Sequence, residues 1–190
     1  MKTSKRSTYH HGDLRAALLT AAGALLDEGG VPAVSLREVA RRVGVTPAAT
    51  YRHFSDKDAL LTALAVRGFE AFAEAMREAA QGAKEPFAEM GVAYVRFAVT
   101  HPGMFRLMFG PAVADRSRSP ELLAVIARST QLFSQGAHAR TDVKPGDPMD
   151  SLRSWATMHG LATLAIDNML PGYDHVMLAQ GLAKLAKPPR

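Results

Sequence analysis

The chain has 190 residues, of which 47% are hydrophobic and 22% are charged, and its formal net charge is +5. This hydrophobic share can supply a buried core, which excludes a disordered chain. The absence of cysteine excludes disulfide scaffolds and thiolate metal sites, and it fits a reducing cytoplasm. No apolar run follows the basic start and no uncharged apolar stretch reaches about 18 residues. We therefore expect a cytoplasmic protein with neither a secretory signal nor a membrane span.

The excess positive charge lies near the amino terminus. Residues 1–57 hold nine Lys or Arg against five acidic residues, whereas the remaining residues hold fourteen against thirteen. A polyanion bound by such a segment releases counterions, so its affinity falls steeply with salt. The alternative interpretation is a solvated basic tail that aids solubility.

Apolar periodicity after residue 12 predicts helices almost throughout the chain. One stripe at helical spacing predicts a first helix that ends at Gly29 and Gly30; its members are Leu14, Ala17, Leu18, Ala21 and Leu25. The later helices are predicted over residues 55–80, 86–99, 102–109, 120–138, 150–170 and 174–186. Ser55 is the expected N-cap of the long helix, and Gly- or Pro-rich segments such as 141–148 separate the later ones.

Residues 31–57 predict two short helices joined by a turn. Ser35 is placed as the first N-cap, with Glu38 completing a capping box, and Gly44 ends that helix. Thr46 is placed to cap the second helix, and Pro47 occupies its first position, where the missing N–H costs nothing. Two short helices across a glycine-containing turn are typical of a helix-turn-helix that reads DNA.

The same residues resemble a known family. Residues 35–60, SLREVARRVGVTPAATYRHFSDKDAL, are similar to the DNA-binding segment of TetR (tetracycline-repressor-like) transcriptional regulators, and residues 8–30 resemble that family's first helix and lead-in. Thr50 stands where many members carry an aliphatic residue. The resemblance covers about the first third of the chain. It implies a dimeric DNA-binding regulator, usually a repressor.

The residue types in the second short helix suit DNA contact. Ala48 and Ala49 let the backbone approach thymine methyls, Tyr51 and Arg52 can reach bases or phosphates, and Arg suits bidentate contact with guanine. The resemblance implies base contact by Arg37 and phosphate contacts by four further residues. The predicted DNA-binding residues are Ser35, Arg37, Thr46, Pro47, Ala48, Ala49, Tyr51, Arg52, His53 and Lys57.

Other polar and aromatic residues near this segment have simpler interpretations. Lys2, Lys5 and Arg6 could extend along DNA as a flexible arm. Tyr51 could instead be a core aromatic like Phe54, which we place in the core, and Arg41 and Arg42 are expected to solvate the outer helix face. His10 and His11 lack a third ligand at useful spacing, so no metal site is predicted.

The predicted fold is all-α, with about nine helices. A three-helix head over residues 1–57 carries the helix-turn-helix, and a larger helical bundle over residues 58–190 serves effector binding and dimerisation. Residues 152–170 are apolar nearly all round, which predicts burial on several sides. With the final helix they predict a four-helix homodimer interface; the alternative is that both helices belong to the core of a monomer.

A second resemblance concerns the body. Residues 154–164, SWATMHGLATL, and residues 101–110, HPGMFRLMFG, resemble the carboxy-terminal domain of a TetR subgroup with a Trp-His-Gly signature. Aromatic and Met side chains suit adaptable binding of a small apolar or amphipathic effector, with His159 as the polar group. The predicted pocket comprises Phe97, Met104, Phe105, Met108, Phe133, Trp155, Met158 and His159. The alternative is that these residues only fill the core.

The leading hypothesis is a DNA-binding transcriptional regulator, a homodimer that an effector releases from a palindromic operator. An enzyme is disfavoured because the sequence has no Gly-rich phosphate loop, GxSxG turn or paired carboxylates in an apolar setting. We expect no cofactor. An architectural DNA-binding protein with a filled body is the remaining alternative.

Overall fold

The computed structural model describes residues 11–113, 115–138 and 148–185. The expected basic arm at Lys2, Lys5 and Arg6, His10, and most of the 141–148 loop lie outside the described residues. Within the described part the fold is all-α, as predicted. The helices are α1 (His11–Ala33), α2 (Leu36–Val43), α3 (Pro47–Tyr51), α4 (Lys57–Ala80), α5 (Pro86–Thr100), α6 (Pro102–Phe109), α7 (Pro120–His138), α8 (Pro148–Ile166) and α9 (His175–Leu185), with a short 3₁₀ turn, η1 (Arg116–Arg118), before α7.

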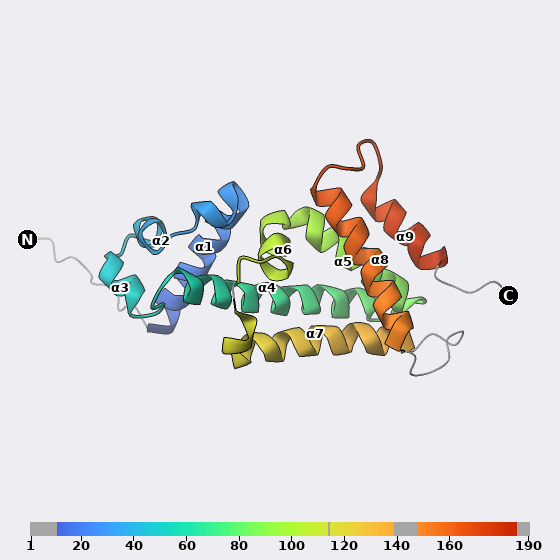
Figure 1. Ribbon diagram of the computed structural model, residues 1–190, viewed down its shortest axis with the longest axis horizontal. Coiled ribbons are helices and arrows are strands. Elements are labelled where there is room, and N and C mark those ends of the chain that lie inside the picture. The colour runs from blue at the N-terminus through green and yellow to red at the C-terminus, as the bar shows by residue number, and fades with distance from the viewer. Residues whose placement is uncertain (1–10, 114, 139–147, 186–190) are drawn as a thin grey trace, which may run out of the picture.

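Helices α1, α2 and α3 form a head at one end of the molecule, and α5 to α9 form the body (Figure 1). Helix α4 runs from the head through the body beside α7. A division of the chain at residue 57 stays a prediction, because one continuous buried cluster extends from α1 through α4 into the body. No described helix has the length and apolar character needed to cross a membrane.

The first helix breaks where its glycines predict. Gly29 and Gly30 leave helical geometry, and Gly30 has φ 66°, in the left-handed region that favours glycine. A further helical turn containing Pro32 follows the break. Its carbonyl oxygen at Val31 accepts a 2.9 Å hydrogen bond from the Lys57 ammonium, which links this turn to the start of α4.

The helix caps confirm part of the predicted pattern. Ser35 Oγ accepts from the Glu38 N–H at 3.2 Å, and Thr46 Oγ1 accepts from the Ala49 N–H at 3.3 Å. The prediction of Ser55 as the α4 cap is wrong. Asp56 caps that helix, with Oδ1 accepting from Ala59 N–H at 2.8 Å, because a carboxylate is the stronger acceptor at a helix amino terminus.

Helix α6 connects the head to the body. The position where Gly103 would carry a Cβ is 2.6 Å from the backbone oxygen of Leu26 in α1, so only glycine allows this approach. A second glycine allows α6 to approach α4, because Gly68 of α4 leaves room for the Met104 side chain of α6. At the far end of α6, Arg106 Nη2 donates to the carbonyl of Ile166 at 2.8 Å and to the Asp167 carboxylate at 2.7 Å.

Helix α8 ends earlier than the sequence predicts. It stops at Ile166 rather than residue 170, and Asn168 adopts a left-handed conformation with φ 55°. Asp174 then caps α9 by accepting from the N–H groups of Val176 and Met177 at 2.9 and 3.0 Å. The shortening follows from the polar Asp167 and Asn168, which favour a turn over helix continuation.

Substituting Gly103 by Ala is expected to lower the free energy of unfolding by about 1–3 kcal/mol, because the new methyl meets backbone that cannot rotate away. Gly23→Ala in α1 is the matched control. Its Cβ would lie 3.9 Å from Leu64 Cδ1, an ordinary contact, so the gain in helix propensity predicts about 0.5–1 kcal/mol of stabilisation. Denaturant titrations measure both; equal effects would contradict the close α6–α1 contact.

Candidate nucleic-acid interface and effector cavity

The second helix of the helix-turn-helix, α3, is short and presents one face outward. Thr50 is fully buried beneath it, whereas Tyr51 is 51% exposed and Arg52 is exposed. Such a helix can enter a major groove with its first turn and exposed side. The buried Thr50 hydroxyl has no hydrogen-bond partner among the described residues, which is the local cost of a polar residue at this apolar position.

The structure keeps every predicted DNA-binding residue accessible. The exposed ones are Arg37, Thr46, Pro47, Ala48, Tyr51 and Arg52, and the half-buried ones are Ser35, Ala49, His53 and Lys57. Lys57 differs from the rest because its ammonium already donates to Val31. Their contacts with DNA stay predictions.

Phe54 lies in the core, as predicted, and is 3% exposed. The Arg15 guanidinium carbon stands 5.3 Å from the centre of the Phe54 ring, so a cation from α1 covers this aromatic side chain. The contact anchors the segment between α3 and α4 against the first helix.

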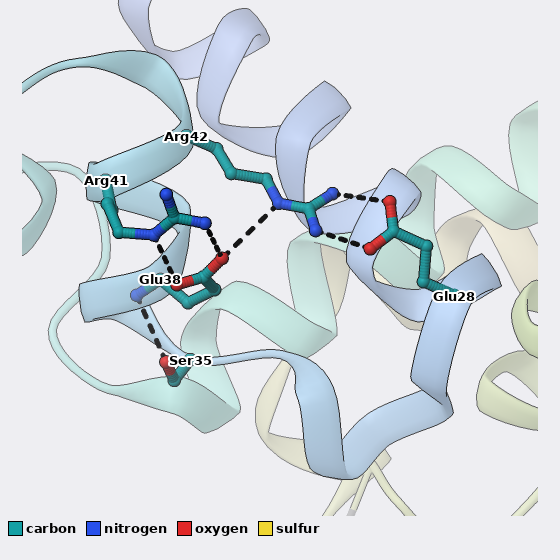
Figure 2. Close-up of polar contacts among 5 residues, drawn as sticks. All are labelled: Glu28, Ser35, Glu38, Arg41 and Arg42. Atoms are coloured by element: carbon teal, nitrogen blue, oxygen red, sulfur yellow. Dashed lines mark hydrogen bonds and ion pairs between the residues drawn. The ribbon is translucent and has the colours of Figure 1, made fainter.

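An ion pair between Arg42 and Glu28 fastens α2 to α1 and corrects the expectation that Arg42 solvates the outer helix face, whereas Arg41 is exposed as expected (Figure 2). Arg42 donates to both carboxylate oxygens of Glu28, and the bond from Nη1 to Oε1 is 2.7 Å long. The Nε atom of Arg42 also lies 3.5 Å from Glu38 Oε1. Arg41 forms a bidentate pair with Glu38, at 2.8 and 2.7 Å. The Glu38 carboxylate therefore faces these arginines rather than completing the predicted capping box.

A cavity of about 590 Å³ lies in the body between α4, α5, α7 and α8. Its wall is mainly aromatic, with hydroxyl groups on α7 and at the start of α8. The lining residues are Phe69, Phe72, Met76, Tyr94, Phe109, Arg116, Ile126, Ser129, Thr130, Ser134, Ser151, Leu152, Trp155 and His159. This size and composition are typical of small-molecule sites.

Three polar side chains form a hydrogen-bonded chain in the cavity wall. Trp155 Nε1 donates to the Tyr94 hydroxyl at 3.1 Å, and that hydroxyl lies 2.8 Å from His159 Nδ1. Burial raises the pKa of the Tyr94 phenol, a shift that the Trp155 hydrogen bond opposes. Burial lowers the pKa of His159, which favours the neutral imidazole.

The structure brings only part of the predicted pocket together. Trp155 and His159 line the cavity, but five of the other predicted residues pack in or against the core instead: Phe97, Met104, Phe105, Met108 and Met158. The Phe105 ring stacks behind His159, with centroids 5.3 Å apart. The side chain of Phe133 lies outside the described residues.

Sequence reasoning missed the cavity residues contributed by α4, α5 and α7. Phe69, Phe72 and Met76 are spaced at i, i+3 and i+7, which marks one helix face but does not distinguish core from cavity. Tyr94 could have been noticed as a phenol within an apolar helix, because a buried hydroxyl requires a partner. No local pattern in the sequence marked Arg116 as a cavity residue.

The described residues include no group of three or more acidic or histidine side chains placed to hold a metal ion. Helices α8 and α9 also carry exposed apolar residues. They are Met149, Leu152, Trp155, Leu164 and Met177, with Met169 and Tyr173 between the two helices, and two of them, Leu152 and Trp155, belong to the cavity wall.

Family profiles match both parts of this architecture. Residues 18–64 match the family described as bacterial regulatory proteins, tetR family, and residues 87–183 match the tetracyclin repressor-like carboxy-terminal domain. The fold and the exposed helix-turn-helix define a two-part helical protein of the regulatory class. The chain belongs to the TetR family. Its placement in the Trp-His-Gly subgroup stays a prediction.

Individual relatives of the chain are named as transcriptional regulators. The chain is 32% identical over 108 residues to the HTH-type transcriptional regulator Rv1816 of Mycobacterium tuberculosis, a match covering 54% of this chain and 46% of that protein. It is 31% identical over 90 residues to the uncharacterized HTH-type transcriptional regulator YobS of Bacillus subtilis, covering 46% and 47%. The chain thus spans about half the length of the curated relatives it matches.

Solved structures match over nearly the whole chain. A Rhodococcus sp. RHA1 protein of unknown function has a TM-score of 0.84 and 35% identity, covering 95% of this chain and 97% of that one. The regulator FadR of Bacillus subtilis, solved with stearoyl-CoA, has a TM-score of 0.72 at 15% identity, covering 91% and 97%. The second likeness shows the fold alone.

The stability of the head is expected to depend on acid pH. The Arg41 hydrogen bond, aided by Arg42, lowers the pKa of Glu38 from 4.5 to about 2. The ionised carboxylate therefore stabilises the folded state above its unfolded pKa, and this contribution disappears as the pH falls from about 4.5 to 2. Glu38→Gln should show a smaller loss of Tm across this window than the unsubstituted protein.

Glu70→Gln is the control, because Glu70 is exposed on α4 and forms no ion pair within the described part of the chain. Its Tm should follow the unsubstituted profile. A Glu38→Gln profile that coincides with both would contradict a stabilising role for the Glu38–arginine pairs.

Proposed function

We propose that the protein is a transcriptional regulator whose paired heads bind a palindromic operator and whose body senses a small molecule. One observation carries this proposal: α3 directs Thr50 into the core while its first turn, Tyr51 and Arg52 remain accessible. This is the arrangement that a groove-reading helix requires. The function is regulatory rather than enzymatic, it is exerted in the cytoplasm, and repression is the expected sign.

The outer face of α8 and α9 is the proposed dimer interface. Leu164 is 45% exposed and Met177 is 66% exposed, and both lie on helices at the edge of the body. Exposed apolar side chains on these two helices favour a self-complementary contact in a twofold dimer. Such a dimer would hold two heads about one DNA turn apart, as a palindrome needs.

Helix α4 supplies the proposed route from effector to DNA. Its middle residues Phe69, Phe72 and Met76 line the cavity, and its first residue Lys57 donates a hydrogen bond to the last turn of α1. A molecule that fills the cavity best in one position of α4 must shift the heads toward the spacing of that state. The Gly103–Leu26 contact gives α6 a second connection to the head.

Arg52→Ala is expected to weaken binding to the operator by about 1–3 kcal/mol and to relax preference at one base pair. Lys84→Ala removes the same charge from an exposed site between α4 and α5, far from the head, and should leave specific binding nearly unchanged. Gel-shift titrations against the DNA upstream of the gene and a scrambled duplex measure both. Equal losses on the two duplexes for Arg52→Ala would refute base reading.

Leu164→Glu is expected to convert the dimer into monomers, because a carboxylate would be buried without a partner in the proposed interface. Leu123→Glu is closely matched: Leu123 is also 45% exposed, but it lies on α7. Sedimentation velocity at micromolar concentration should show a monomer for the first variant only. Dimers of both variants would place the interface elsewhere.

The proposal as a whole is tested by the same gel shift with excess nonspecific competitor at two salt concentrations. A discrete complex that resists competitor, with two protected half-sites on footprinting, is the expected result. Binding that competitor abolishes would leave only nonspecific attachment by the basic head.

A further inference from the structure

The cavity in the body has a marked charge asymmetry. Among the residues that line it, Arg116 is the one formally charged side chain, and no carboxylate is present. One guanidinium N–H donates to the Gly110 carbonyl at 2.8 Å. Within the described part of the chain, no acidic group lies within ion-pair distance of Arg116.

The nearest carboxylate in sequence is directed elsewhere. Asp115 Oδ1 accepts hydrogen bonds from both the backbone N–H and the hydroxyl of Ser117, at 3.1 and 2.5 Å. These bonds shape the η1 turn and leave the half-buried guanidinium of Arg116 at the cavity wall. A planar guanidinium with free donors is suited to bidentate binding of a carboxylate.

The remaining polar groups in the wall include further hydrogen-bond donors. The Trp155 N–H can only donate, so the Tyr94 oxygen accepts it, and the Tyr94 hydroxyl shares a second hydrogen bond with His159 Nδ1. Where the Tyr94 hydroxyl donates in that bond, a neutral His159 carries its hydrogen on Nε2 and can donate it to a ligand. Ser151 Oγ, also in the wall, is buried without a partner among the described residues.

Two hydroxyl groups on α7 already donate their hydrogens to backbone carbonyls of the same helix. Ser129 donates to the Val125 carbonyl at 2.9 Å, and Thr130 donates to the Ile126 carbonyl at 3.0 Å. The polar groups in the wall that can still donate to a ligand therefore include Arg116, Ser134, Ser151 and His159. This balance favours a ligand that brings acceptors, whereas an ammonium group would be buried without a counter-charge.

The cavity extends along α7. Ile126 and Ser134 are eight residues apart on that helix and both line it, which corresponds to about 12 Å. Arg116 belongs to the turn that precedes α7, at the end of that helix away from the start of α8 (Figure 1). Between these ends the wall is mostly aromatic, with Phe69 and Phe72 on the α4 side.

We propose that the ligand of this cavity is an elongated organic acid, with an apolar or aromatic body lying along α4 and α7 and a carboxylate bound by Arg116. The inference rests on the proposed function only in taking the cavity as the effector site. It adds the chemical class of the effector and the residue that selects it.

Three molecules of the same shape but different charge test the class: phenylhexanoate, phenylhexanol and phenylhexylamine. Trp155 is the single tryptophan of the chain and lines the cavity, so its fluorescence reports occupancy in the absence of DNA. The acid is expected to bind at least about tenfold more tightly than the alcohol or the amine. Equal or tighter binding of the alcohol or amine, or no binding of the acid, would overturn the proposal.

Substitutions test whether Arg116 is the side chain that selects the acid over the alcohol and the amine. Arg116→Gln should abolish the preference for the acid, and Arg116→Lys should retain part of it. Arg118→Gln removes the same charge from the same turn, at an exposed residue that does not line the cavity, and should retain all of it. Preserved preference in Arg116→Gln, or equal loss in Arg118→Gln, would refute the role of Arg116.

A parallel gel shift separates this inference from the proposed function. Acid binding that leaves operator affinity unchanged would overturn the effector mechanism and uphold the ligand class. Release of the operator by the amine but not the acid would overturn the ligand class and uphold the effector mechanism.

Discussion

Burial of α4 is the constraint on which head and body both depend. Leu60, Leu61 and Leu64 at its start and Phe69, Phe72 and Met76 further along belong to one buried cluster, which also contains side chains of α1 and of the body. A helix buried at both ends transmits a displacement as a rigid element, because close-packed interiors deform little. The helix that contacts the cavity is therefore also the helix that holds the head.

Interactions around the head stiffen it without covering its outward face. Three contacts lie between helices of the head or at the start of α4: the Glu28–Arg42 pair, the Arg15–Phe54 contact and the Lys57–Val31 hydrogen bond. Individually, exposed ion pairs contribute little to stability. Their combined effect is geometric. The Arg42–Glu28 pair holds α2 on α1, and the other two contacts hold the segment after α3 and the start of α4 on the same helix.

Different sides of helix α8 face the core, the cavity and the outside of the body. Met158, Leu161 and Ala162 face the core, Trp155 and His159 face the cavity, and Leu164 faces outward. This division explains why residues 152–170 look apolar nearly all round. A sequence can show that such a helix has no polar face, but it does not show which neighbour each side meets.

Sequence by itself determined the local structure of this protein: the all-α class, the break at Gly29 and Gly30, the Ser35 and Thr46 caps, and the family resemblance in the head. These follow from periodicity and capping, which act within a few residues. Only the tertiary structure decided that Arg42 pairs with Glu28 of α1, that Phe105 and Met108 fill the core, and that Arg116 meets Tyr94 and His159 at one cavity. The physical reason is that these outcomes depend on contacts between helices distant in sequence, whose packing no local pattern specifies.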